Sequence, residues 1–349
     1  MILDNKLKLG IVGLGRLGME YAKNITYRVP NAQLYAACSI RDSELNVVKE
    51  SLNVPFLYSS YKEMLKNKDI DAIVIITSTN QHADQIILAL ESGFHVFCEK
   101  PLAIDINECS RVQKKVKEFP HLISMLGFVR RYDESYSEAK AKLDEGLVGK
   151  PFFIRSQTAD KDTLAPFQVE FCTTGGGIFH DFSVHDIDLV HWFTGSNIKK
   201  VWSLGGAYRF KEFEKAGDAD NTFAMCELEN GTMALLGASR VSSFGHNTFT
   251  EIMATKGNLK IGDPPHKNRL QISDKYGVRH ECLDSFFDRF SEAFVFQIKD
   301  FVDCVTRGIQ PELTIENAAK ATLVATALTK SFKEKTLINV DDLKPKINS

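Results

Sequence analysis

The residues with the clearest potential for chemistry lie together between Gly175 and Trp192, in the stretch GGGIFHDFSVHDIDLVHW. If the residues after Gly177 form a helix, Asp181 and His185 stand four residues apart on one face, and Asp188 follows three residues later. A neutral imidazole can take the proton of a hydroxyl, and a nearby carboxylate orients the ring and stabilises the imidazolium. This spacing therefore predicts an acid–base site, in which the role of Asp188 stays open.

The same spacing also describes a polar helix face with one or two histidines satisfied inside a core, and the stretch alone does not separate the two interpretations. His180, Asp186 and His191 point elsewhere on such a helix, so we expect them to be structural. Within the acid–base interpretation, Asp181 either orients His185 or hydrogen-bonds a substrate.

A second chemical group is Glu99-Lys100-Pro101, which follows a strand predicted over 95–98. A lysine at the carboxyl end of a parallel strand faces the crevice in which α/β enzymes bind cofactor and substrate. There its ammonium group can stabilise negative charge that develops on a reacting oxygen. Pro101 restricts Lys100 to an extended backbone and makes their bond a candidate for the cis form. A surface lysine before a helix-starting proline is the alternative.

The elements that must position these groups begin with a dinucleotide-binding pattern. The strand predicted over 7–12 runs into GLGRLG and then into a helix predicted over 17–29. In this pattern the first glycine permits a tight turn, the second lets the backbone approach a pyrophosphate, and the third lets helix pack on strand. The phosphates bind at the helix N-terminus, where free N–H groups and the helix dipole favour an anion. The cofactor contacts expected here are Gly13, Gly15, Arg16, Leu17 and Gly18.

The end of the second predicted strand, 33–38, bears on the choice between NAD and NADP. An NAD enzyme usually holds the adenosine ribose there with an acid, and this chain has Ser39 instead. Arg16 and Arg41 can reach a 2′-phosphate, although both are also consistent with a solvated surface, and Asp42 is a possible substitute for the acid. Both cofactors therefore stay open.

Further strands deliver small polar residues to the same edge of the predicted sheet. Strand 71–76 ends in TSTNQH, and helix 82–92, a glycine stop and strand 95–98 complete another strand–helix–strand unit. Short hydroxyl side chains at the carboxyl end of a strand line a nucleotide crevice well. The remaining elements predicted in this half are helices 61–65 and 107–119 and strand 122–128.

The chain of 349 residues is long enough for about two domains. After a helix that ends near residue 145, the pattern changes to short strands with hairpin turn signals, which indicates an antiparallel sheet. The strands are predicted over 152–157, 200–208, 221–228, 232–239, 248–254, 258–261 and 269–273, and two helices over 285–306 and 315–333 close the chain. The histidine-rich stretch lies between the first two of these strands.

We therefore expect an α/β protein with an N-terminal Rossmann domain over 1–128. The second domain, 129–349, is expected to be an α+β substrate-binding and oligomerisation domain with a large open, mostly antiparallel sheet, its last helices packing back on the first domain. The open face of this sheet, with Phe210, Phe213, Phe223 and Leu235, suits a subunit interface of a homo-oligomer, a dimer or a tetramer.

Composition limits the partners. With 25% charged residues and a net charge of −2, the chain has no charge field that favours nucleic acid, and its longest apolar runs are too short for a membrane span. Residues 1–13 lack the apolar core of a signal peptide. The seven scattered cysteines form no C-x-x-C pair, which predicts reduced thiols, a cytoplasmic location and no metal site.

Four motifs together resemble the Gfo/Idh/MocA oxidoreductase family. They are GLGRLG, FCEKP, GFVRRYD and GGGIFHDFSVHDIDLVHWFTG, and their order and spacing extend the likeness over essentially the whole chain. RRYDESY and the D-x-x-x-H-D-x-D segment are most similar to the inositol dehydrogenases within the family.

The resemblance implies that Lys100, Asp181 and His185 are the catalytic group and that these three and Arg130 contact the substrate. Glu99 and Ser39 are further expected cofactor contacts. Thr77, Thr79 and His82 fall where the family's T-P-N-x-x-H motif lines the cofactor, but Ser78 replaces the proline and Thr79 replaces the asparagine. Ser39 departs from the acid usual in NAD-dependent inositol dehydrogenases.

The predicted function is the NAD(P)-dependent oxidation of a secondary hydroxyl on a cyclic polyol, above all myo-inositol to 2-keto-inositol. Hydride passes to C4 of the nicotinamide, His185 takes the hydroxyl proton and Lys100 holds the reacting oxygen. A sugar or nucleotide-sugar dehydrogenase is the rival enzyme, and a non-catalytic dinucleotide-binding regulator is the rival of another class. The segment 156–171, which helps to set the hydroxyl pattern of the substrate, does not distinguish among them.

Overall fold

The computed structural model describes residues 6–262 and 265–345. The chain divides into two compact units, of which unit 1 contains Met1–Tyr132 and Glu292–Ala319, and unit 2 contains Asp133–Ser291 and Lys320–Ser349. Residues 1–5, on which the expectation about a signal peptide partly rests, lie outside the described residues. Within the described residues, no helix is both long and apolar enough to cross a membrane.

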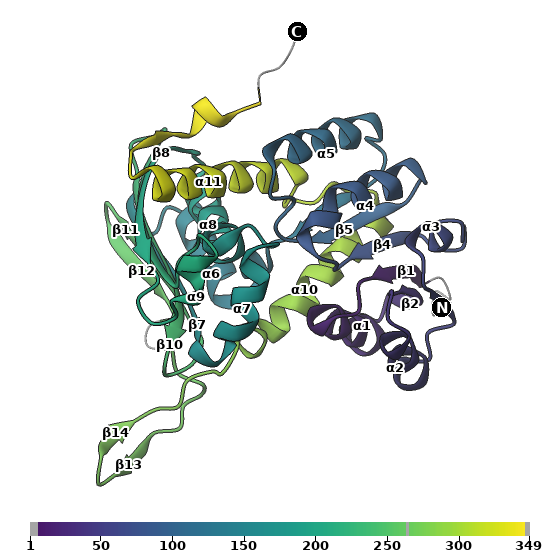
Figure 1. Cartoon of the computed structure of the whole chain (residues 1–349), viewed down its shortest axis with the longest axis horizontal. Helices are drawn as coiled ribbons and strands as arrows, with labels where there is room; N and C mark the ends of the chain where they lie inside the picture. Colours follow the sequence, from purple (N-terminus) through teal and green to yellow (C-terminus); the bar gives the residue numbers. More distant parts are fainter. Residues whose placement is uncertain (1–5, 263–264, 346–349) are drawn as a thin grey trace. The chain divides into compact units, whose positions relative to one another are not determined.

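Unit 1 is built on a six-stranded sheet in which every pair of neighbouring strands is parallel (Figure 1). The strand order is β3-β2-β1-β4-β5-β6, so the direction of winding reverses between β1 and β4. Such a reversal opens a crevice at the carboxyl ends of the strands, where ligands bind in folds of this kind. The strands are β1 (Leu7–Val12), β2 (Ala32–Cys38), β3 (Phe56–Tyr58), β4 (Ala72–Ile75), β5 (His95–Glu99) and β6 (Ser124–Gly127).

The strands of unit 1 form from short segments that are mainly apolar. All four residues of β4 are buried, as a strand covered by helices on both faces requires. The helix after β1 buries Gly18, Tyr21, Ala22 and Ile25, which recur at the spacing of one helix face. The helices are α1 (Arg16–Arg28), α2 (Asp42–Leu52), α3 (Tyr61–Met64), α4 (Thr79–Glu91) and α5 (Ile106–Glu118), with most of α10 (Phe286–Arg307).

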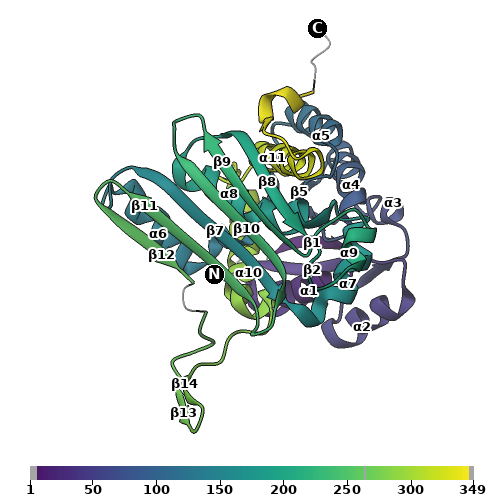
Figure 2. The same ribbon diagram turned by 60° about the vertical axis from the view of Figure 1, so that its left-hand side comes forward.

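Unit 2 contains a seven-stranded mixed sheet in the order β12-β11-β7-β10-β9-β8-β15 (Figure 2). Only the β7–β10 pair is parallel among these described strands, which confirms the open, mostly antiparallel sheet expected from the sequence. The strands are β7 (Pro151–Lys161), β8 (Ile198–Gly206), β9 (Asn221–Leu228), β10 (Met233–Ser242), β11 (Asn247–Ala254), β12 (Gly257–Ile261) and β15 (Ile338–Asn339).

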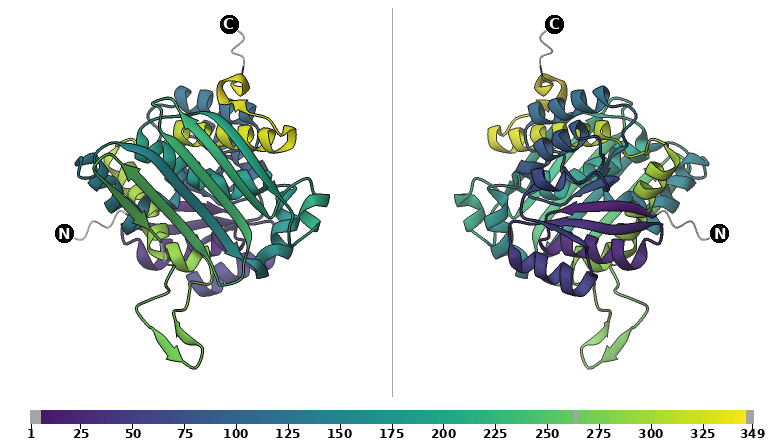
Figure 3. Two further views of the ribbon diagram at one scale, coloured as in Figure 1. Left: turned by 90° about the vertical axis from the view of Figure 1, so that its left-hand side faces the viewer. Right: turned by 90° about the vertical axis from the view of Figure 1, so that its right-hand side faces the viewer.

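The two faces of this sheet differ in chemistry because side chains alternate along each strand. Ile154, Ser156 and Thr158 of β7 are buried, and in the described chain the helices of unit 2 lie over this face only (Figure 3, left). The other face carries Phe223 and Met225 of β9, which are exposed. The helices of unit 2 are α6 (Glu134–Asp144), α7 (Ala165–Cys172), α8 (Val184–Thr194), α9 (Glu212–Lys215) and most of α11 (Ile315–Glu334).

Two aromatic residues expected on the open face are elsewhere. Phe213 lies in α9 and is 0% exposed, in a cluster with Ala165, Cys172 and Ala207, and Phe210 packs against the same cluster. The chain leaves the sheet here because the carboxylate of Asp220 accepts the backbone N–H groups of residues 208, 209 and 210 and holds them in a loop. Phe223 and Leu235 do lie on the open face, on β9 and β10.

The strand expected over 269–273 is not part of the large sheet either. β13 (Ile272–Asp274) pairs with β14 (Gly277–Arg279) in a separate two-stranded hairpin, which projects from the rest of unit 2 (Figure 3). Local contacts stabilise the turn of the hairpin. Asp274 Oδ1 accepts the N–H of Tyr276 at 2.9 Å, and Gly277 adopts a positive φ of 106°.

Candidate functional site

The three glycines of the turn between β1 and α1 differ in the space around them. Gly13 has a φ of +89°, and a Cβ there would lie 2.5 Å from the carbonyl oxygen of Ile76. A Cβ at Gly18 would lie 1.9 Å from the carbonyl oxygen of Gly13. A Cβ at Gly15 would instead meet no described atom within 4 Å beyond its own residue and its two chain neighbours. Two glycines thus pack the turn and the middle one leaves its backbone approachable, which fits a bound pyrophosphate.

The N-terminus of α1 faces this open position. Gly15 is the residue before the helix and offers no side-chain cap. The first N–H groups of a helix have no acceptor within the helix itself. The helix begins at Arg16, one residue before its predicted start, so Arg16 and Leu17 are its first two residues. Since the helix dipole adds positive potential here, the turn suits a dinucleotide phosphate.

Ser39 lies beside the same turn. β2 ends at Cys38, which pairs with Val12, and the N–H of Gly13 donates to the carbonyl oxygen of Cys38 at 3.0 Å. Ser39 is buried, whereas the side chain of Arg41 is 70% exposed and its Nη1 lies 3.0 Å from Oε1 of Glu44.

His82 and Thr77 hold the ends of β4 and β5 together. The ring nitrogens of His82 lie 2.8 Å from the carbonyl oxygen of Pro101 and 3.0 Å from that of Thr77. Burial lowers the pKa of His82, against the two carbonyl oxygens, which raise it. Thr77 Oγ1 donates to Oε1 of Gln85 at 2.6 Å, and Thr79, the first residue of α4, is buried. In unit 1 the His82 side chain thus connects the TSTNQH stretch to the EKP motif.

Glu99 is turned into the interior of unit 1. Its carboxylate accepts the hydroxyl of Tyr21 and, at 3.0 Å, the backbone N–H of Lys100, while Gln297 donates to the Tyr21 oxygen. Burial raises the pKa of Glu99. The bond between Lys100 and Pro101 is cis, as the sequence suggested. Glu99 therefore fixes the backbone of Lys100, which lies half-buried at the carboxyl end of β5.

Arg130 lies in a 3-10 segment, Val129–Tyr132, directly after β6. It is among the largest fully buried side chains of the molecule. The hydroxyl of Tyr132 donates to Asp300 of α10 at 2.7 Å and anchors this segment within unit 1.

The histidine-rich stretch of unit 2 is helical, but the regular α-helix expected after Gly177 is wrong over Phe179–Ser183. These residues form a π-helical segment that continues into α8. Gly176 and Gly177 precede it with φ values of +82° and +79°. π-Helical segments of this kind have more residues per turn than an α-helix and occur often at functional sites.

Asp181 and His185 therefore lie on one continuous helical stretch, though not with simple α-helical spacing. Asp181 belongs to the π-helical segment and is half-buried. His185 is the second residue of α8 and is buried, with its ring 5.3 Å from that of Phe286. Asp188 is buried on the same helix.

The contacts of His180, Asp186 and His191 support the structural roles expected for them. Asp186 is buried, and its carboxylate accepts the hydroxyls of Ser156 and Thr158 of β7 at 2.6 and 2.7 Å. Burial lowers the pKa of His180 to about 4, so this imidazole is neutral at physiological pH. The Nε2 atom of His191 accepts the N–H of residue 198 at 3.2 Å.

The structure adds a buried ion pair that motif analysis missed. Arg240 of β10 is 0% exposed, and its Nη1 lies 2.6 Å from Oδ2 of Asp218. The other oxygen of Asp218 accepts the N–H of Ile178 at 3.1 Å, in the turn just before the π-helical segment. The guanidinium of Arg240 lies over the rings of Phe213 and Phe182, at 4.5 and 5.5 Å from their centroids. The only sequence signal was an arginine inside an apolar strand.

The sequence motifs also did not predict a second contact, between His246 and Asp160. Nδ1 of His246 lies 2.7 Å from Oδ1 of Asp160, and Gln168 of α7 donates to the other oxygen of Asp160 at 3.0 Å. The ring of Phe286 lies 5.5 Å from that of His246, so it contacts both His246 and His185. The segment 156–171 thus supplies a carboxylate, that of Asp160, to the histidine that shares the Phe286 ring with His185.

The predicted site residues form two groups. Gly13, Gly15, Ser39, Thr77 and Lys100 gather in unit 1, at the carboxyl ends of parallel strands. Asp181 and His185 lie in unit 2, on one helical stretch. The first group can hold a dinucleotide, and the second can exchange a proton with a hydroxyl.

Two family models match the chain in succession. The model for the NAD-binding Rossmann fold of the GFO/IDH/MocA oxidoreductase family matches residues 7–126. The model for the GFO/IDH/MocA C-terminal domain matches residues 136–260. Together the two matches cover well over half of the chain.

The chain is also similar to named dehydrogenases along its whole length. It shares 33% identity with the scyllo-inositol 2-dehydrogenase (NAD(+)) of Bacillus subtilis, over 97% of this chain and 98% of that protein. A solved scyllo-inositol dehydrogenase from Lactobacillus casei, with bound NAD(H) and scyllo-inositol, is 36% identical with a TM-score of 0.93, over 96% of this chain and 99% of that one. A myo-inositol 2-dehydrogenase structure from Lactobacillus plantarum is 35% identical with a TM-score of 0.93, again over 96% and 99%.

The Asp218–Arg240 pair yields a stability prediction. Asp218→Ala leaves the guanidinium of Arg240 buried without its carboxylate, so we expect the free energy of unfolding to fall by about 3–5 kcal/mol. Asp284→Ala is the matched control, because it removes the partner of Lys161 in an exposed ion pair and should change stability little. Urea unfolding at one protein concentration measures both. Equal losses of unfolding free energy in the two variants would contradict the larger contribution of the buried Asp218–Arg240 pair to stability.

Proposed function

Because this chain belongs to the Gfo/Idh/MocA family of NAD-binding oxidoreductases, we propose that it is a dehydrogenase that oxidises a secondary hydroxyl of an inositol with NAD. The observation that carries the proposal is its likeness, along the whole of both chains, to inositol dehydrogenases, one of them solved with NAD(H) and scyllo-inositol. Myo-inositol is the substrate expected from the motifs, and scyllo-inositol is a second candidate because the first of these relatives is named for it. Both give a keto-inositol.

The acid–base chemistry falls to unit 2. NAD, when bound, supplies the acceptor for the hydride that leaves the carbinol carbon. His185 takes the proton of the reacting hydroxyl, because a neutral imidazole is a general base near neutral pH. Asp181 orients His185 and stabilises the imidazolium that forms, or holds a neighbouring hydroxyl of the substrate.

Lys100 is proposed to hold the reacting oxygen. Its ammonium group stabilises the negative charge that grows on this oxygen as the proton leaves. Glu99 and His82 act on Lys100 through the backbone, because Glu99 accepts the Lys100 N–H and His82 contacts the carbonyl oxygen of Pro101. These contacts support positioning roles for Glu99 and His82, beside the cofactor contacts expected of them. Arg130 is proposed as a further substrate contact.

We also propose a functional division into a dinucleotide domain, 1–128, and a substrate and assembly domain, 129–349. The cytoplasm is the proposed location, because the seven cysteines, all within the described residues, are free thiols, and disulfides are rare in reducing compartments.

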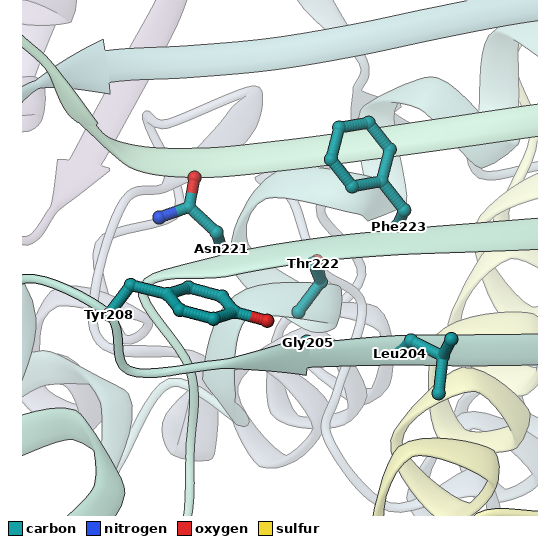
Figure 4. A pocket seen from close by; sticks show the side chains of 6 residues that line it. All are labelled: Leu204, Gly205, Tyr208, Asn221, Thr222 and Phe223. Carbon is teal, nitrogen blue, oxygen red and sulfur yellow. The ribbon is translucent and has the colours of Figure 1, made fainter.

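The open face of the unit 2 sheet is proposed to be an interface between copies of this chain. The paired strands place apolar side chains next to one another across β8, β9 and β10, where Trp202 pairs with Met225 and Met225 with Leu235. A hollow on the same face is lined by Leu204, Gly205, Tyr208, Asn221, Thr222 and Phe223 (Figure 4). Exposed apolar surface of this extent is typical of a protein interface, and symmetric dimers and tetramers are the common assemblies.

A substrate panel tests the proposed function. We expect nicotinamide reduction with NAD and with myo-inositol or scyllo-inositol, and little with glucose or other aldoses at the same concentration. Absorbance of the reduced nicotinamide measures the rate. Faster turnover of an aldose would favour the sugar dehydrogenase, and NAD binding without turnover of any polyol or sugar would favour a regulator.

His185→Ala tests the general base. We expect kcat to fall about 10²- to 10⁴-fold because the proton acceptor is lost, while the dissociation constant of NADH stays near that of the unmodified protein. His191→Gln, on the same helix, is the control and should keep its turnover, because glutamine can still accept the N–H of residue 198. Near-normal kcat in His185→Ala would remove His185 from the mechanism.

Phe223→Asp tests the interface. The side chain of Phe223 is 53% exposed on the apolar part of the open face, so a charge there should convert a dimer or tetramer into smaller species. Lys260→Ala changes the polar edge of the same sheet, where Lys260 pairs with Glu251, and should leave the assembly intact. Light scattering after size exclusion gives the masses. A monomeric unmodified protein, or an unchanged mass in Phe223→Asp, would contradict the proposal.

A further inference from the structure

We infer that Glu44 is the acid that makes this chain select NAD over NADP, replacing the carboxylate that the end of β2 lacks. The inference rests on the proposed dinucleotide function and adds the cofactor preference of the same site. Glu44 stands in the first turn of α2, five residues after Ser39, outside the motif that usually identifies the acid.

The position follows from the strand ends. Ser39 comes directly after Cys38, whose carbonyl oxygen is hydrogen-bonded to the N–H of Gly13 in the glycine turn. In folds of this kind, an acid near the end of the second strand binds the hydroxyls of the adenosine ribose. Ser39 therefore occupies the place of the ribose-binding acid.

The hydrogen bonds around Ser39 bring a carboxylate to this place. Ser39 Oγ accepts the backbone N–H of Arg41 at 3.1 Å and donates its own proton to Oε2 of Glu44 at 2.5 Å. The other oxygen, Oε1, accepts Nη1 of Arg41 at 3.0 Å. Glu44 thus serves as an acceptor on both oxygens, which the ionised form does best. Asp42, the substitute considered from the sequence, is exposed at the start of α2.

The carboxylate keeps the capacity to bind a ribose. An ionised carboxylate has about four lone-pair sites, and the two hydrogen bonds use two of them. Ser39 and Arg41 hold the side chain of Glu44 in place. This side chain is 18% exposed, so a ligand at the surface can still reach it. Ribose hydroxyls are donors, and a charged acceptor binds them more strongly than a neutral one.

The same charge opposes NADP. A 2′-phosphate carries up to two negative charges near neutral pH, and two like charges a few ångströms apart repel. The ion pair with Glu44 also occupies the guanidinium of Arg41, which the sequence suggested as a contact for that phosphate. Removal of the Glu44 charge should therefore weaken NAD binding and release Arg41 to bind the 2′-phosphate.

The test measures dissociation constants of NADH and NADPH by fluorescence titration of the full chain, with no polyol present. We expect Glu44→Gln to bind NADH about tenfold more weakly and NADPH about tenfold more tightly, because a charged acceptor is lost and a repulsion removed. Asp42→Asn removes an equal charge two residues away and should keep the preference of the unmodified protein. Adding Arg41→Ala to Glu44→Gln should abolish the gain for NADPH.

A rescue variant distinguishes the loss of the Glu44 charge from a general loss of structure. Adding Ser39→Asp to Glu44→Gln places a carboxylate at the strand end itself and should restore the preference for NADH. The inference is overturned if the unmodified protein prefers NADPH, or if Glu44→Gln and Asp42→Asn keep the same ratio of dissociation constants. An unmodified protein that binds neither dinucleotide would instead overturn the proposed function.

Discussion

The close approach of three strand ends at the glycine turn is the constraint on which the nucleotide site depends. Gly18 lies so near the carbonyl oxygen of Gly13 that any side chain there would force α1 away from β1. Around this turn the N–H of Gly13 binds the end of β2, and the N–H of Ile76 binds the carbonyl oxygen of Val12 at 2.9 Å. The same packing that leaves the backbone open at Gly15 therefore places Ser39 and Thr77, so one steric condition sets the positions of several residues proposed to contact the cofactor.

Carboxylates with protein partners do most of the positioning elsewhere. Glu99 fixes the backbone of Lys100, Asp218 joins Arg240 to the start of the helical stretch that carries Asp181 and His185, and Asp186 joins that stretch to β7. Buried carboxylates are stable only when their oxygens are hydrogen-bonded, so each of these contacts is expensive to break. Asp181 is half-buried in the π-helical segment and so keeps some access to the surface.

Much of this architecture could be predicted from local sequence. β1 and β9 have the predicted bounds, because a short, mainly apolar segment bounded by turn signals specifies a strand with little help from distant residues. The family resemblance carried by four motifs is confirmed by both family models. The features that local sequence could not predict depend on contacts with residues far along the chain. The turn before the π-helical segment is bound by Asp218, forty residues away, and the cluster that buries Phe213 includes Ala165 of α7.

The departure at Ser39 shows why a motif can mislead about charge. A sequence motif tests one position at the end of β2, whereas the ribose hydroxyls need an acceptor within reach, and a charged one binds them most strongly. The first turn of α2 folds back on that strand end, where the N–H of Glu44 donates to the carbonyl oxygen of Arg41 at 3.1 Å. The longer side chain of glutamate then spans the remaining gap to Ser39. A serine that looked like the loss of the acid is thus compatible with the same electrostatic preference, since the carboxylate has moved from the strand to the helix that follows it.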